Sequence, residues 1–233
     1  MAALGFFLLE KFWAGKLTFY INQRYVWLVL LAGFGLMGLA LATFNHLPPV
    51  WVKNEGLLEP KMAPRNSQIQ LIIFLIVLIF GMLIPVTSLG ADAAEARGVS
   101  SAIPLTTGGT IPETLTIDPS SRTVLEWLWA FKQAEDPTSL VGQSVDVDGF
   151  MFIDAQLPDG YYMVGRFIIT CCVADATAIG IALLPNGEMD VPDGWVNVQG
   201  TMNLTTINGT EALLIDAEQI IPIDVPDQPY LYP

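Results

Sequence analysis

The chain has 233 residues, of which 52% are hydrophobic and only 14% are charged, a composition typical of proteins with membrane-embedded segments. Its formal net charge of −13 repels phosphate backbones, which argues against nucleic-acid binding. Residues 1–89 hold six of the ten Lys and Arg but only three of the 23 Asp and Glu. We therefore predict a membrane region over 1–89, followed by an acidic soluble domain.

Three apolar stretches make up the predicted membrane region. Residues 25–44 carry no charge and are long enough to cross about 30 Å of hydrocarbon. Residues 69–89 form the most hydrophobic run and predict a second span, with Pro85 kinking or closing its helix. Residues 3–20 contain Glu10, Lys11 and Lys16, so they form either a first span or an amphipathic helix on the membrane surface. We expect two or three transmembrane helices.

The orientation of the soluble domain depends on the number of spans. With two spans, the N-terminus and the soluble domain share one side, opposite Lys53, Lys61 and Arg65. With three spans, the positive-inside rule places this basic loop in the cytoplasm and the acidic domain outside. The charge count barely separates the two arrangements.

A linker and one helix are predicted between the membrane region and the strands. Residues 90–117 are rich in Gly, Ala, Ser, Thr and Pro and show little periodicity, which indicates a linker. Asp118 as an N-cap and Pro119 at the first helical position predict a helix over 119–135. Trp127 falls outside its apolar face.

The soluble domain spans 118–233, and five stretches in it are predicted strands: 143–153, 161–173, 176–184, 195–203 and 211–219. Glycines in the first, second and fourth allow sharp bending, and Gly149 marks a predicted bulge or bend. These features favour a small, closed, OB-like barrel over 140–220, with a β-sandwich fragment as the alternative. The predicted fold class is a membrane-anchored α+β protein, in which one helix precedes an all-β barrel.

The segment RFIITCCVAD, residues 166–175, contains both cysteines of the chain. In a strand, adjacent side chains alternate sides, so Cys171 and Cys172 should point in opposite directions. One buried thiol and one surface thiol is then the simplest interpretation. A metal site would need both sulfurs turned together and further ligands, for which Asp175 is the nearby candidate. The soluble domain has no histidine, which argues against a closed zinc site, and the sequence requires no cofactor.

Arg166 would lower the pKa of a thiol only if it lay beside that thiol, and strand spacing places it too far away. We expect it to pair with Asp175 or another carboxylate. Asp146, Asp148 and Asp154 are predicted to be solvating charges on a strand face. The sole histidine, His46, lies in the loop beyond residue 44, so no Ser-His-Asp set can form. We predict that the protein is not an enzyme; a thiol-redox activity, the alternative, would need an exposed cysteine of low pKa.

Five segments resemble the YcgQ-like bacterial membrane proteins. They are GKLTFYINQRYVWL at 15–28, VDGFMF at 147–152, VGRFIITCCVADA at 164–176, DGWVNVQG at 193–200 and PDQPYLYP at the end. The resemblance implies an N-terminal membrane region, a C-terminal domain of unknown function, a larger multi-span permease partner and, for some members, an association with metal homeostasis. Within these segments we single out five candidate binding or family-marking residues: Arg166, Cys171, Cys172, Asp175 and Trp195.

Together, the residues and the resemblance lead us to expect an accessory subunit of a permease in the bacterial plasma membrane. Its barrel would lie outside the cytoplasm, dock on the multi-span partner and handle a transition metal or a small solute. The alternative is an envelope binding or scaffold module with structural cysteines and no transport role.

Overall fold

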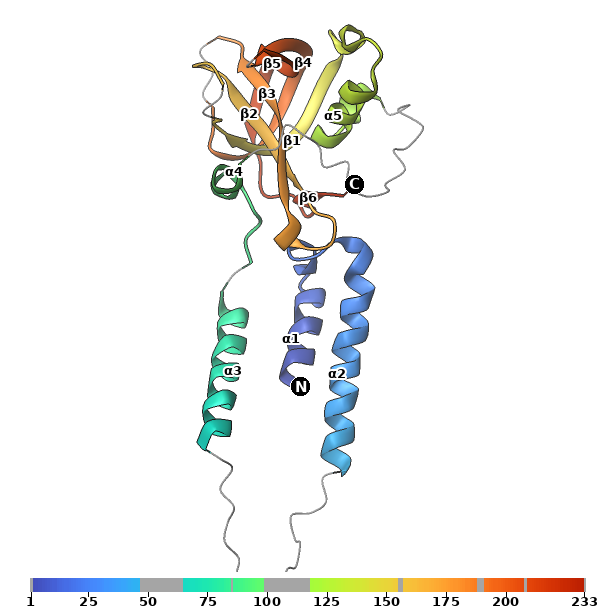
Figure 1. Cartoon of the computed structure of the whole chain (residues 1–233), viewed down its shortest axis with the longest axis vertical. Helices are drawn as coiled ribbons and strands as arrows, with labels where there is room; N and C mark the ends of the chain where they lie inside the picture. The colour runs from blue at the N-terminus through green and yellow to red at the C-terminus, as the bar shows by residue number, and fades with distance from the viewer. Residues whose placement is uncertain are drawn as a thin grey trace, which may run out of the picture. The chain divides into compact units, whose positions relative to one another are not determined.

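A computed structural model describes residues 2–46, 65–84, 86–98, 118–154, 157–187, 191–207 and 209–232. The chain divides into two compact units, Met1–Thr87 and Ser88–Pro233, and Figure 1 draws the helices and strands of each. The division falls close to residue 89, where the sequence predicts the end of the membrane region.

The first unit contains three α-helices, α1 (Ala2–Trp13), α2 (Val26–His46) and α3 (Arg65–Leu83). Two 3-10 turns, Leu17–Phe19 and Gln23–Tyr25, lie between α1 and α2. The first two helices pack closely, because a Cβ added to Gly5 would lie 2.9 Å from the carbonyl oxygen of Gly33. Gly33 therefore lies in the contact between the two helices, whereas Gly35 and Gly38 face open space.

The structure confirms only part of the prediction of two or three transmembrane helices. Among the described residues, one helical stretch, Gln23–Thr43, is long and apolar enough to cross a membrane. The stretch 3–20 is not one helix: α1 ends at Trp13, and its 12 residues rise only about 18 Å. The apolar run Ile72–Gly81 within α3 is shorter than a span. Helix α3 also ends before Pro85, as expected because a proline disfavours helical backbone in the residue before it.

The second unit begins with two helices, α4 (Ala91–Arg97) and α5 (Val124–Gln133), and two 3-10 turns, η3 (Pro119–Ser121) and η4 (Pro137–Leu140). The strands among its described residues are β1 (Ser144–Phe152), β2 (Tyr162–Ile168), β3 (Thr177–Pro185), β4 (Gly194–Ile207), β5 (Thr210–Pro222) and β6 (Tyr230–Leu231). A further 3-10 turn, η5 (Val173–Asp175), precedes β3.

The strands close into a five-stranded barrel. Their order is β1-β4-β5-β3-β2, and pairing of β1 with β2 completes the circle. Neighbouring strands are antiparallel except β3 and β5, which are parallel. Strand β6 from the C-terminal tail adds in parallel to β2. The barrel prediction is confirmed, and the alternative of an open sandwich is wrong.

The bulge lies in β5, where Glu218 is the extra residue opposite Gln199 and Gly200 of β4, and the pairing at Gly149 has none. Gly149 pairs regularly with Val196, whereas the register between β4 and β5 shifts between Gln199 and Gly200. A Cβ on Gly200 would overlap the carbonyl oxygen of Asp216, so glycine lets the two strands approach at the bulge.

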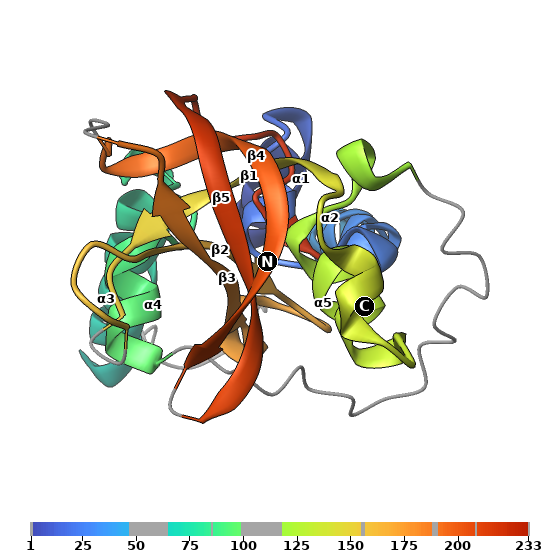
Figure 2. The ribbon, with the colours of Figure 1, turned by 90° about the horizontal axis from the view of Figure 1, so that it is seen from above.

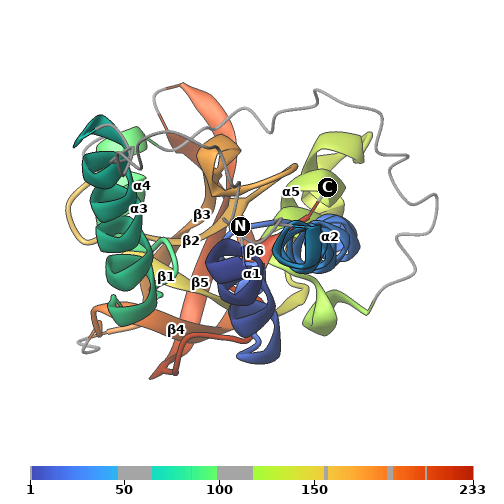
Figure 3. The same ribbon diagram turned by 90° about the horizontal axis from the view of Figure 1, so that it is seen from below.

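Two hydrophobic clusters lie on opposite faces of the strands. The first fills the barrel with alternate residues of the five strands and is covered by Val124, Leu125 and Trp127 of α5. The second joins Phe150, Phe167 and other outward-facing side chains to Ala94 of α4 and Tyr230 of the tail. Figures 2 and 3 show α4 and α5 on opposite sides of the barrel, so each helix covers one cluster.

The helices of this unit differ from the sequence prediction. The predicted helix 119–135 is two pieces, because Asp118 caps η3 and Thr123 forms a capping box with Glu126 at the start of α5. In this register Trp127 faces the barrel and is fully buried, contrary to the sequence prediction. The predicted linker 90–117 contains helix α4, whose residues Ala-Asp-Ala-Ala-Glu-Ala-Arg mostly favour helix.

Candidate functional site

The two cysteines lie in a loop and not in a strand. Strand β2 ends at Ile168, and residues 169–176 connect it to β3 through the turn η5. The two sulfur atoms are 3.6 Å apart. The prediction of opposite directions is therefore wrong, because strand alternation no longer applies after Ile168.

Asp175 shapes this loop from within. One carboxylate oxygen, Oδ1, accepts a hydrogen bond from the backbone N–H of Thr170 at 3.1 Å. The other, Oδ2, accepts one from the backbone N–H of Cys171 at 2.7 Å. Both oxygens thus hold the backbone that carries the first thiol, so Asp175 positions the cysteines rather than standing free as a ligand.

The same carboxylate affects the protonation of the Cys171 thiol. Cys171 is exposed and Cys172 is half-buried. Hydrogen bonding of the Cys171 thiol to Asp175, and then to Cys172, raises the pKa of Cys171 to about 11. Burial would raise the pKa of Asp175, but hydrogen bonds from the Cys171 thiol and from backbone N–H groups outweigh it and lower that pKa. Cys171 is protonated at neutral pH and lacks the low pKa that a thiol-redox centre requires.

Helix α4 contacts the cysteine loop and holds it through one arginine side chain. The Nη1 atom of Arg97 donates to the carbonyl oxygens of Val173 at 3.3 Å and Ala176 at 3.2 Å. Sequence reasoning missed Arg97 because its segment was taken for a linker. The available signal was the short run of helix-favouring residues that ends at this arginine.

Arg166 lies in a separate, buried cluster. Its Nη1 donates to the carbonyl oxygen of Asp148 at 3.2 Å, and its Nη2 donates to that of Gln228 at 2.6 Å. The guanidinium carbon is 5.1 Å from the ring centroid of Trp195, which in turn meets Phe150 edge to face. Burial lowers the pKa of Arg166 to about 10.

Arg166 and Trp195 therefore join β1, β2 and β4 to the C-terminal tail, and the structure does not place them in the cysteine loop. The predicted pairing of Arg166 with Asp175 is wrong. Arg166 and Trp195 are each only 8% exposed. This burial suits residues that hold parts of the domain together better than residues of a ligand-binding surface. Among the described residues, no group of three or more His, Cys, Asp or Glu side chains could hold a metal ion.

Two family models match the chain. The DUF1980 N-terminal domain matches residues 1–100, and the DUF1980 C-terminal domain matches residues 116–233. The chain belongs to the DUF1980 family. A search of curated proteins and a search of solved structures each found no significant match.

The two matches cover both units of the DUF1980 chain, the helical unit and the barrel. The family description assigns no activity, so the cysteine loop must be interpreted from its own geometry. It is the part of the barrel unit where nucleophilic side chains converge at the surface.

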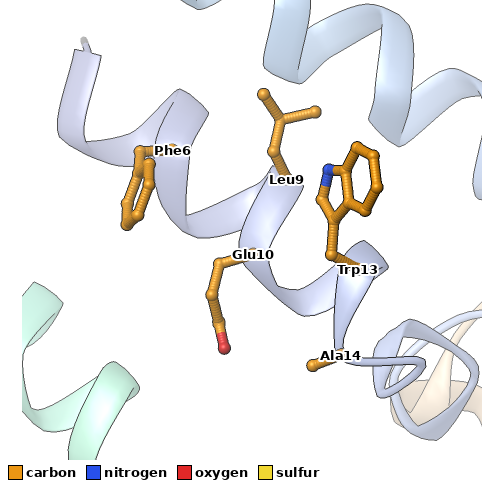
Figure 4. Close-up of a pocket in the computed structure, with 5 residues that line it drawn as sticks. All are labelled: Phe6, Leu9, Glu10, Trp13 and Ala14. Carbon is orange, nitrogen blue, oxygen red and sulfur yellow. The ribbon is translucent and has the colours of Figure 1, made fainter.

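A second candidate region lies on α1. A cavity of about 550 Å³ is lined by Phe6, Leu9, Glu10, Trp13 and Ala14. Figure 4 shows the Glu10 carboxylate pointing away from the Trp13 indole, so the lining side chains do not converge. The carboxylate is instead paired with Lys11 at 3.3 Å. The cavity contains none of the residues singled out from the sequence.

A third group is the set of acidic side chains on the outer face of β1. The Nδ2 atom of Asn197 donates to Asp146 at 2.6 Å and to Asp148 at 2.9 Å. Asn197 in turn accepts from Gln199 at 2.9 Å. The amides of β4 thus neutralise part of the charge repulsion between two neighbouring carboxylates, and the group serves the pairing of β1 with β4.

Proposed function

We propose that this DUF1980 protein is a membrane-anchored accessory subunit of a permease, whose barrel docks on a multi-span partner and handles a metal ion or a small solute. The observation that carries the proposal is the apolar stretch Gln23–Thr43. Large side chains along it are exposed, with Leu31, Phe34 and Leu41 each about 60% accessible. Exposed apolar surface of this extent needs lipid or another membrane helix to cover it.

The barrel supports a binding role. Its circular strand order, with β3 and β5 parallel, is the arrangement that we assign to the OB type. Small barrels of this type commonly present a binding surface. Fold alone does not fix a ligand, so the metal or small solute rests on the cysteine loop and on the resemblance to YcgQ-like proteins.

We place the protein in the bacterial plasma membrane with its barrel outside the cytoplasm. The segment between α2 and α3 contains Lys53, Lys61 and Arg65, and short basic loops favour the cytoplasmic side. If α3 also crosses the membrane, the acidic barrel then lies on the opposite side.

Co-purification tests the partner. We expect a multi-span protein to be recovered with the tagged, full-length chain after gentle detergent extraction. Gly35 and Gly38 face open space on α2, so Gly38→Leu should leave the fold intact. It should nevertheless reduce recovery of a partner whose helix packs closely there, because a small residue permits that approach.

Leu41→Ile on the same helix is the matched control and should leave recovery unchanged. Repeated recovery of the intact protein without any multi-span partner contradicts the proposal. That result would favour the envelope scaffold module instead.

A further inference from the structure

The distance between the two thiol sulfur atoms suits a metal ion bound between them. Their sulfurs lie 3.6 Å apart. Two metal–sulfur bonds of about 2.3 Å at a near-tetrahedral angle span about 3.7 Å between sulfurs, whereas a linear pair would span about 4.6 Å. The loop therefore holds the two sulfur atoms close to the separation expected for one metal ion with a bent S–metal–S angle.

A disulfide between the same residues suits this backbone less well. Bridged cysteines have Cα atoms roughly 4.4–6.8 Å apart, but consecutive Cα atoms across a trans peptide are about 3.8 Å apart. Closure would thus strain the loop, while chelation of an ion needs no such movement of the sulfurs.

We propose that Cys171 and Cys172 form a two-thiolate site for one soft transition-metal ion, with the remaining coordination positions open. Thiolate ligands select soft ions such as Cu(I) and the borderline Zn²⁺. On binding, each thiol loses its proton and the metal accepts an electron pair from each sulfur, so one divalent ion displaces two protons. No oxidant or reductant is involved.

Asp175 acts here as a positioning residue. Its two oxygens hold the backbone N–H groups of Thr170 and Cys171, and its negative charge favours a cation beside the sulfurs. The described residues offer no third ligand, so water or a group from another molecule must complete the coordination. Such an open site suits release and exchange of the ion, whereas structural zinc sites are closed.

The inference deepens the proposed function, on which its biological use rests: a barrel that docks on a permease would pass the ion between the two proteins. The binding itself needs no partner. We would titrate the purified, reduced, full-length protein in detergent with Cd²⁺, and follow the thiolate-to-cadmium charge-transfer absorption together with proton release. We expect one ion per chain and two protons released.

Substitutions of the two cysteines and of Asp175 test whether these residues form the metal site. Cys171→Ser and Cys172→Ser should each remove the two-sulfur absorption signature, and the double variant should abolish binding at this site. Asp175→Asn should weaken binding by about tenfold, as for other residues that orient ligands. Asp159→Asn removes an exposed charge in another loop and is the matched control.

Circular dichroism would confirm that each variant remains folded. The proposal is overturned if the reduced wild-type protein shows no thiolate absorption with Cd²⁺, or if either single variant binds like the wild type. Because no partner is present, either outcome is independent of the co-purification result.

Discussion

A buried cation inside a small domain must recover the free energy that it loses on leaving water. Arg166 does so with two backbone carbonyl groups and the face of Trp195. Both carbonyls belong to segments far apart in the chain, Asp148 in β1 and Gln228 in the tail. The side chain thus determines where the tail lies on the barrel.

We expect Arg166→Met to lower the free energy of unfolding by about 1–3 kcal/mol, because two carbonyl groups lose their donor. Arg166→Lys should lie between wild type and Met, since lysine lacks the planar fork that reaches both oxygens. Urea denaturation of the full-length protein in detergent measures both. Lys132→Met, on an exposed face of α5, is the control; equal stability of the two Met variants would show that the clamp contributes nothing.

The segment RFIITCCVAD illustrates how far residue-level prediction reaches. The segment holds both cysteines of the chain, which identified the loop where the two thiols meet. Its sequence also identified Asp175 as their neighbour. The geometry was wrong because no glycine or proline marks the end of β2 at Ile168, so strand alternation was extended too far. The anchoring by Arg97 could not be found from periodicity, because it joins residues 76 and 79 positions apart.

At the level of elements, helix α5 shows why a short helix is stable at this place. It has only ten residues, fewer than an isolated helix needs in water. Its capping box satisfies exposed N–H groups at the first turn, with the Glu126 carboxylate accepting from the backbone N–H of Thr123 at 2.7 Å. The cap orients Trp127 towards the barrel core.

We expect Thr123→Ala to lower the free energy of unfolding by about 1 kcal/mol through loss of this cap. Thermal unfolding followed by Trp fluorescence would detect the change. Thr138→Ala, which removes a hydroxyl that donates to Asp136 in the turn η4, tests whether any short turn has the same effect. A loss no larger than that of Thr138→Ala would contradict a specific role for the α5 cap.

The strands were predictable as elements because the alternation of apolar and polar residues is a local signal. Barrel closure, by contrast, rests on pairings such as Phe150 with Gly165 and Ala182 with Leu214, which no local pattern specifies. Helix α4 was not predicted from the sequence, because the small and polar residues around it are typical of a linker. Its packing comes from Ala94 against the outer cluster, a tertiary contact.

For the whole molecule, the proposed membrane anchoring leaves two possible sides for the barrel, and the side decides which ligands it can meet. Cys171 is exposed, so a membrane-impermeant thiol reagent can report its location. If the barrel is outside, intact cells labelled at alkaline pH, where part of the Cys171 thiol is ionised, should give a signal, and permeabilisation should add little. Cys171→Ser should lose most of this signal while Cys172→Ser keeps it. Labelling that appears only after permeabilisation would place the barrel in the cytoplasm.

The pH dependence of the same labelling tests the geometry of the loop. With the pKa of Cys171 raised to about 11 by its contact with Asp175, about one thiol in 10⁴ is ionised at pH 7, and the thiolate is the reactive form. The labelling rate should therefore rise about tenfold per pH unit up to pH 10. Asp175→Asn removes the carboxylate that accepts the hydrogen bond of the Cys171 thiol, so the labelling rate of this variant at pH 7 should be higher and should level off at lower pH. A wild-type rate that already levels off near pH 8.5, the ordinary thiol value, would show that the carboxylate does not control Cys171.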